Sequence, residues 1–215
     1  MLKGLAIKLR KLNRICPIKG SHEENINIGS QVIVETDRGV EFGQIIEVCE
    51  QILISVIRDV KLKRVVRYAG TEDRERVNEM TSNEQTAANL CTDKIAEYDL
   101  PIKLIDAEEM FDKSKMFFYY NQFEPNKTIN TKELAKNIAG ILKIKIDMIM
   151  IQPRDKARIC GGLGPCGKTL CCSSWLQKYP HVTVKTIKGQ GLSLSSNKTS
   201  GMCGRLLCCM KYEAE

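Results

Sequence analysis

The chain has 215 residues, of which 43% are apolar and 27% charged, an ordinary composition for a globular protein with one large core or two modest ones. No apolar run approaches the ~18 residues that a membrane-spanning helix needs. Residues 1–10 alternate apolar and basic side chains instead of forming an apolar signal core. These features argue against a membrane-spanning or secreted protein, and we predict a cytoplasmic location.

The positive charge lies in the last part of the sequence. Residues 1–153 carry 23 Lys and Arg against 23 Asp and Glu, whereas residues 154–215 carry 10 against 3, which accounts for the net charge of +7. Such cations can offset bound thiolates, form a footprint for nucleic acid, or simply keep the segment soluble. The charge alone leaves these three interpretations open.

Strand-forming patterns dominate the first 60 residues. In the first of them, Leu5, Ile7 and Leu9 alternate onto one face. Two later runs are joined by Asp37-Arg38-Gly39, which is a hairpin signal. The predicted strands are residues 3–11, 29–35, 40–48 and 51–57. We predict a small antiparallel β-barrel or sheet over residues 1–60.

From about residue 61 the pattern becomes mixed α/β. Apolar residues at helical spacing predict a long helix over residues 72–98, with Cys91 on its core face, and a second helix that begins near a capping-box signal of Asn130 with Glu133. The predicted strands are residues 62–68, 101–106, 115–121 and 145–152. The order βαββαβ predicts a ferredoxin-like α/β sandwich over residues 61–153, a name for topology that implies no iron.

Residues 154–215 have too little apolar periodicity to fold around a core of their own. Leu170, Trp175 and Leu176 suffice for one short packed helix, yet the segment holds seven of the ten cysteines. A weak core with many thiols is typical of a segment folded by metal. We therefore predict a third, cysteine-rich and metal-stabilised segment over residues 154–215.

One seven-residue pattern occurs twice in this segment, as CGKTLCC at residues 166–172 and as CGRLLCC at residues 203–209. Each copy reads Cys-Gly-basic-x-Leu-Cys-Cys, and the second begins 37 residues after the first. Because the cytoplasm keeps thiols reduced, clustered cysteines there are more typical of metal ligands than of disulfides. The candidate ligands are Cys166, Cys171, Cys172, Cys203, Cys208 and Cys209.

This segment could form several kinds of site. Residues 162–169 match the P-loop pattern GxxxxGK[ST], but no strand leads directly into them and the second copy has Arg-Leu in place of Lys-Thr. Structural zinc prefers CxxC pairs and histidines, and this chain has no CxxC in the segment and only His22 and His181. Iron–sulfur clusters use cysteines at varied spacings, including the C-x4-C found in both copies. Redox sensing by thiols is a further alternative.

Three runs together resemble the RicT (YaaT) family of bacterial proteins, which carries the conserved C-terminal region first named in a yeast polymerase-suppressor protein. They are GGLGPCGKTLCCSSWL at residues 161–176, LSLSSNKTSGMCGRLLCCMKYE at 192–213, and VIVETDRGVEFGQI at 32–45. The resemblance implies a cytoplasmic, non-catalytic subunit that joins small helical RicA-like and RicF-like partners in a complex with [4Fe-4S] clusters. It also implies an association with RNase Y, mRNA processing, sporulation, competence and biofilm development.

We therefore predict a regulatory scaffold subunit, not an enzyme, since no nucleophile–histidine pair or acid–base constellation is apparent in the sequence. One [4Fe-4S] cluster, or two shared with partner chains, is expected at the six cysteines. The alternative is a zinc-stabilised RNA-binding protein that needs no partner. Its phosphate contacts would come from Lys156, Arg158, Lys168, Lys185, Lys188 and Arg205.

Overall fold

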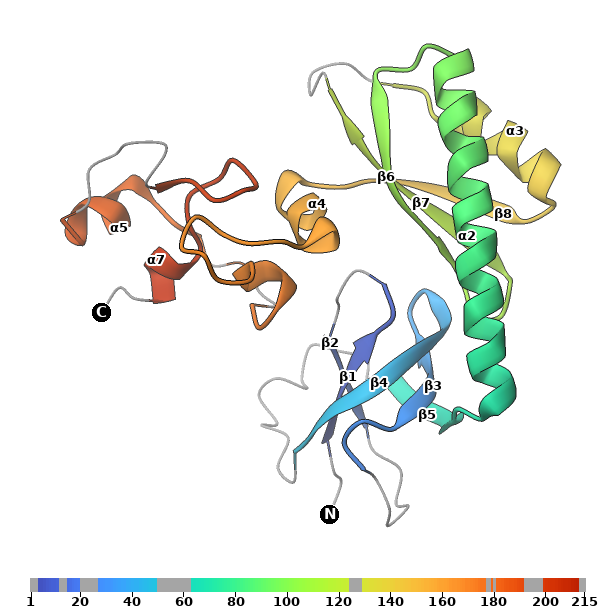
Figure 1. Ribbon diagram of the computed structural model, residues 1–215, viewed down its shortest axis with the longest axis horizontal. Coiled ribbons are helices and arrows are strands. Elements are labelled where there is room, and N and C mark those ends of the chain that lie inside the picture. The colour runs from blue at the N-terminus through green and yellow to red at the C-terminus, as the bar shows by residue number, and fades with distance from the viewer. Residues whose placement is uncertain are drawn as a thin grey trace. The chain divides into compact units, whose positions relative to one another are not determined.

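The chain separates into two compact units, residues 1–150 and residues 151–215 (Figure 1). The computed structural model describes residues 4–11, 15–19, 27–49, 63–123, 129–176, 179, 181–191 and 199–212. Within those residues, every helix is too short or too polar to cross a lipid bilayer.

The first unit begins with a closed five-stranded β-barrel. Its strands are β1 (Gly4–Leu9), β2 (Ile15–Lys19), β3 (Gln31–Thr36), β4 (Gly39–Cys49) and β5 (Lys63–Tyr68). Their order around the barrel is β1-β2-β5-β3-β4, with β1 paired to β4 to close it. The β3–β4 hairpin is where the sequence predicts it, whereas β2 lies in a stretch predicted as loop. The strand predicted at residues 51–57 lies outside the described residues.

Alternating apolar side chains fill the barrel. Leu5, Ile7 and Leu9 of β1 are buried, which confirms the predicted face of this strand. Gly43 on β4 lets the neighbouring strand approach closely, because a Cβ there would lie 2.6 Å from Ile7 Cγ2. Side chains from the other strands complete this core, namely Val32, Val34, Ile45, Val65 and Tyr68.

An α/β sandwich follows the barrel within the same unit. Its elements are α2 (Thr71–Glu97), β6 (Ile102–Glu109), β7 (Lys115–Gln122), α3 (Lys132–Leu142) and β8 (Lys145–Met150). The sheet order is β6-β7-β8, with β6 antiparallel and β8 parallel to β7. Parallel strands require a crossover, and α3 supplies it between β7 and β8.

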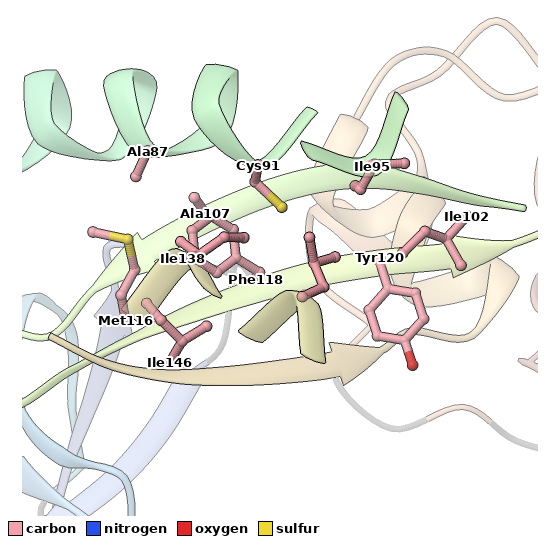
Figure 2. Close-up of a cluster of buried hydrophobic side chains, with 11 residues drawn as sticks. Ala87, Cys91, Ile95, Ile102, Ala107, Met116, Phe118, Tyr120, Ile138 and Ile146 are labelled. Atoms are coloured by element: carbon pink, nitrogen blue, oxygen red, sulfur yellow. The ribbon is translucent and has the colours of Figure 1, made fainter. Parts of the chain in front are cut away.

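Both helices cover one face of this sheet. Figure 2 shows side chains from α2, among them Cys91 and Ile95, pointing towards Phe118 and other residues of the strands. Leu134 and Ile138 of α3 bury themselves in the same cluster. Cys91 is fully buried, which confirms its predicted place in the core, and burial raises the pKa of its thiol to about 12.

The predicted ferredoxin-like sandwich is wrong in its first strand. Residues 62–68 were assigned to it, but β5 pairs with β2 and β3 of the barrel, and the sheet formed by the described residues of the sandwich has three strands. Arg64 and Arg67 are exposed on β5, whereas its Val65 and Tyr68 pack into the barrel. A strand with one exposed face suits a barrel wall and a sheet covered on one side equally well, so long-range pairing and not local composition places β5 in the barrel.

Buried ion pairs join the barrel to the sandwich. Arg38, from the β3–β4 turn, pairs with Glu108 of β6 and lies 4.5 Å from the Phe117 ring centroid. The Tyr119 hydroxyl donates to the same carboxylate. Burial raises the pKa of Glu108, and Arg38 opposes that shift. A buried charge of this kind is tolerated only when it is paired, so the two parts fold as one unit.

The second unit is largely irregular. Its regular segments are α4 (Pro153–Cys160), a 3-10 turn (Cys171–Ser173), α5 (Val184–Gly189) and α7 (Cys209–Tyr212). Pro153, predicted to close the sandwich, is the first residue of α4, a position that proline favours. Leu170 and Leu176 are buried as predicted, but Trp175 is 54% exposed, so it does not belong to a core helix.

Asp73 provides a test of how α2 is anchored to the barrel. Its carboxylate accepts a hydrogen bond from Arg67 Nη2 at 2.8 Å and another from the Gly70 N–H at 2.8 Å. The Arg67 bond is the main cause that lowers the pKa of Asp73 to about 2. A lowered pKa stabilises the fold above the ordinary value of 3.8, and that stability is lost as pH falls from 3.8 towards 2.

We expect Asp73→Asn to lower the free energy of unfolding by about 1 kcal/mol at pH 7, a value discounted because Arg67 is half-exposed. The difference in free energy of unfolding between the variant and the wild type should shrink as pH falls from 3.8 towards 2. Urea unfolding followed by circular dichroism at several pH values measures it, with exposed Asp93→Asn on the same helix as the control. A deficit that does not change with pH, or that equals the control, would contradict the assigned ion pair.

Candidate functional site

The two copies of the cysteine pattern fold in the same way. We call residues 162–175 repeat 1 and residues 199–212 repeat 2. In repeat 1 the Gly164 N–H donates to the Lys168 carbonyl at 2.8 Å and the Gly167 N–H donates to the Gly164 carbonyl at 2.9 Å. Repeat 2 makes the corresponding bonds at its own positions 37 residues later, with the same two distances. The duplication is therefore one of structure as well as sequence.

This bonding defines a hairpin with a three-residue loop. A turn of this kind ends in a residue with left-handed backbone, where a side chain would be strained. Gly167 and Gly204 hold that position with φ of 75° and 71°. The Cys-Gly pair at the head of each copy is thus explained, because glycine closes the hairpin and places the preceding cysteine, Cys166 or Cys203, at the loop.

The chain then turns back so that the paired cysteines follow at a fixed place. The Leu170 N–H donates to the Gly162 carbonyl at 3.1 Å, and its counterpart, the Leu207 N–H, donates to the Thr199 carbonyl at 2.9 Å. Immediately afterwards each repeat enters a short helical turn, which contains both vicinal cysteines in repeat 1 and begins at the second of them, Cys209, in repeat 2. The identical spacing in the two copies therefore places three cysteines per repeat at the same positions relative to its hairpin.

All six predicted cysteines line a single pocket of about 350 Å³, which we call the cysteine pocket. Its other walls include Arg154 and Ala157 of α4 and apolar residues of both repeats. Cys172 is buried and Cys166 is exposed, and the remaining four are half-buried. Cys160, which was not among the predicted ligands, is exposed and does not line this pocket.

The six sulfurs share this pocket without meeting at one point. Across the part of the chain that the structure describes, no three His, Cys, Asp or Glu side chains group closely enough to hold a single metal ion. The donors lining the pocket are nevertheless uniform, because its titratable residues are cysteines and Arg154 alone. Soft thiolates select zinc, Cu(I) and iron–sulfur clusters over hard cations.

The thiols affect one another electrostatically. Burial raises the pKa of Cys172, and the thiols of Cys208 and Cys203, across the pocket in repeat 2, raise it further. Burial also raises the pKa of Cys208, whereas Arg154 lowers it. These groups are protonated at neutral pH, so any metal that binds must displace protons, and the arginines of α4 offset the thiolate charge that results.

The exposed aromatic residues follow the same repeat. Trp175 and Tyr212 occupy equivalent positions, 37 residues apart, and are 54% and 56% exposed. Their rings meet edge to face with centroids 4.8 Å apart. Leu163 of repeat 1 and Met202 of repeat 2 are also largely exposed. The sequence predicts Trp175 in a core, and the prediction misses this pair. Its one sequence signal is that Tyr212 occupies the position of Trp175 when the two copies are aligned.

The P-loop interpretation of residues 162–169 does not fit this geometry. A phosphate loop leaves a buried strand and opens a helix so that its N–H groups face the ligand. Here the loop follows helix α4 and closes as a hairpin, and the N–H groups of Gly164 and Gly167 are already bonded within it. Lys168 is exposed and does not line the cysteine pocket.

Comparison with known proteins bears on the same segments. The model of the PSP1 C-terminal conserved region matches residues 63–151, and that of the third domain of PSP1-like proteins matches residues 181–215. The chain is 38% identical to the stage 0 sporulation protein YaaT of Bacillus subtilis, over 99% of this chain and 76% of that protein. The chain belongs to the YaaT (RicT) family.

A more distant relative extends the comparison beyond bacteria. An uncharacterized protein of Schizosaccharomyces pombe is 25% identical over 59% of this chain and 20% of its own length. No solved structure matches the chain. The match to YaaT spans both units, so it includes the barrel, the sandwich and the two repeats.

We expect that Mg-ATP and Mg-GTP do not bind this chain and that Lys168→Ala changes nothing in this respect. The reason is that the amides that would hold phosphates close the hairpin instead. Isothermal titration of the wild type and the variant checks this. Micromolar binding by the wild type that Lys168→Ala abolishes would restore the phosphate-loop interpretation.

Proposed function

We propose that this chain is a non-catalytic regulatory subunit whose second unit binds a [4Fe-4S] cluster, or shares two with partner chains, at the cysteine pocket. The observation that carries the proposal is that all six predicted cysteines, three from each repeat, line that one pocket. A regulatory role agrees with membership of a family whose Bacillus subtilis relative is a stage 0 sporulation protein.

The donor set favours a cluster over a single ion. A [4Fe-4S] cluster takes four cysteine thiolates, and the pocket offers six with no competing carboxylate or imidazole among its described lining. Zinc takes four ligands at about 2.0–2.3 Å from one point, an arrangement that the described residues do not provide. When bound, a cluster of this kind supplies a redox-sensitive link, while Arg154 and Arg158 stabilise the thiolates that hold it.

The surface around the pocket suits protein partners. Trp175 and Tyr212 form an exposed aromatic pair, and exposed Leu163 and Met202 lie on the two hairpins. Exposed apolar side chains grouped beside a functional pocket are typical of interaction sites. We propose that this surface meets RicA-like and RicF-like helical proteins, which supply the thiolates that a second cluster lacks.

The resemblance to the RicT family extends the proposal to cellular function. Through its partners the chain would modulate mRNA processing that depends on RNase Y, and thereby sporulation, competence and biofilm development. Such work requires binding and not catalysis, and it requires the reducing cytoplasm, where the six thiols remain free to bind metal. Contact with RNA through RNase Y would be indirect.

The experiment that tests the proposal measures iron, sulfide and zinc in the chain purified without oxygen after co-expression with its partners. We expect wild type to hold iron and acid-labile sulfide, and Cys166→Ser and Cys203→Ser to lose most of both together with partner binding, because a hydroxyl is a poor substitute for a soft thiolate.

Cys160→Ser is the matched control, since this exposed cysteine lies in the same unit but not at the pocket. It should retain full iron. Colourless wild-type protein that holds zinc would instead support the zinc-stabilised RNA-binding alternative. Full iron and full partner binding in both pocket variants would show that the repeats pack or undergo transient redox chemistry.

A further inference from the structure

A second pocket lies in the same unit and is lined in part by residues of repeat 2. It encloses about 410 Å³ and is lined by Arg154, His181, Val182, Ser200, Gly204, Arg205 and Leu206. We call it the basic pocket. It contains none of the cysteines, and no carboxylate is among the described residues that line it. Two guanidinium groups and an imidazole therefore face a space with no anionic partner of its own.

The two arginines are held in place but keep donors free. Arg205 Nη2 donates to Gln152 Oε1 at 2.7 Å, which leaves the other donors of its guanidinium available. Arg154 lies over the Tyr179 ring, 5.0 Å from its centroid. Its Nε is buried and has no hydrogen-bond partner among the described residues. Arginines fixed in this way recognise phosphate, whose oxygens match the guanidinium fork.

The position of Arg154 adds to the favourable field. It is the second residue of α4, whose first residue is Pro153 and whose N-cap residue, Gln152, makes no side-chain cap bond. The N-terminal end of a helix carries partial positive charge, which favours a nearby anion. The basic pocket is thus lined by two arginines, one of which lies in the first turn of a helix.

We propose that the basic pocket binds a phosphodiester group of single-stranded nucleic acid. A metabolite site is normally a mostly apolar cavity with a few polar groups, whereas two arginines, a histidine and a serine line this pocket beside Val182, Gly204 and Leu206. The whole net charge of +7 lies in residues 154–215, as expected for a segment that follows a polyanion. The same unit exposes Trp175 and Tyr212, and exposed aromatic rings stack unpaired bases.

This inference goes beyond the proposed function, in which RNA contact is indirect, and apart from Arg154, which lines both pockets, it uses different residues from the cluster. The duplication supplies an unusually close control. Lys168 occupies in repeat 1 the place that Arg205 occupies in repeat 2, with the same hairpin and the same charge, but it lines neither pocket. Loss of either residue removes one positive charge from the same unit.

The test uses the full-length protein and a fluorescently labelled single-stranded RNA of about 15 nucleotides, a length that covers typical single-strand sites. Fluorescence anisotropy measures affinity at low and physiological salt. We expect the wild type to bind, Arg205→Ala to weaken binding by about tenfold, and Lys168→Ala to weaken it by no more than about threefold, because a positioned arginine contributes more than a diffuse charge.

Further arms identify the ligand and guard against misfolding. Equal binding of single-stranded DNA supports recognition through the backbone, and RNA preferred over DNA supports the same site with added contact to the 2′-hydroxyl. Iron content should be unchanged in Arg205→Ala, which would show that repeat 2 is intact, and His181→Ala should also weaken RNA binding.

Absence of RNA binding by wild type, stronger binding of duplex RNA, or equal losses of affinity in Arg205→Ala and Lys168→Ala would overturn the proposal. If millimolar inorganic phosphate binds but RNA does not, the pocket is an anion site only and the proposal fails.

Discussion

The second unit depends on one backbone arrangement, the hairpin that closes when the Gly164 N–H reaches the Lys168 carbonyl, and on its copy 37 residues later. Each hairpin requires a left-handed residue after its first cysteine, and glycine meets that requirement without strain. The loop cysteine and the vicinal pair then follow the hairpin at the same positions in both repeats. Because two such hairpins line the same pocket, six thiols share it where a single hairpin would present three.

The first unit depends on the contacts that join its barrel to its sandwich. The buried carboxylate of Glu108 is compensated by Arg38 from the barrel hairpin and by the Tyr119 hydroxyl from the sheet. Removing one partner would leave an unpaired buried charge, which is far more costly than losing a surface contact. The cluster of Ile33, Met80 and Phe111 adds apolar contact to the same junction.

The sequence predicted much of this arrangement where short-range patterns decide it. Alternation identified β1, helical spacing identified α2 and its buried Cys91, and the repeated cysteine pattern named the six residues that line one pocket. It failed where long-range pairing decides, because β5 has the same local signal in a barrel as in a sandwich. Arg38 pairs with Glu108 and Trp175 with Tyr212, and neither pair can be predicted from the sequence around its residues. The same holds for the basic pocket, which brings together Arg154 and Arg205.

The central claim is that the two repeats form one site and not two independent ones. It is tested most directly by iron per chain, determined without oxygen and with partners co-expressed, after replacing Cys203, Cys208 and Cys209 together by serine while repeat 1 is left unchanged. Since the pocket needs thiols from both repeats, the account predicts that nearly all iron is lost. Retention of about half of the wild-type iron, as expected if each repeat's three cysteines and one partner thiolate held a separate cluster, would contradict it.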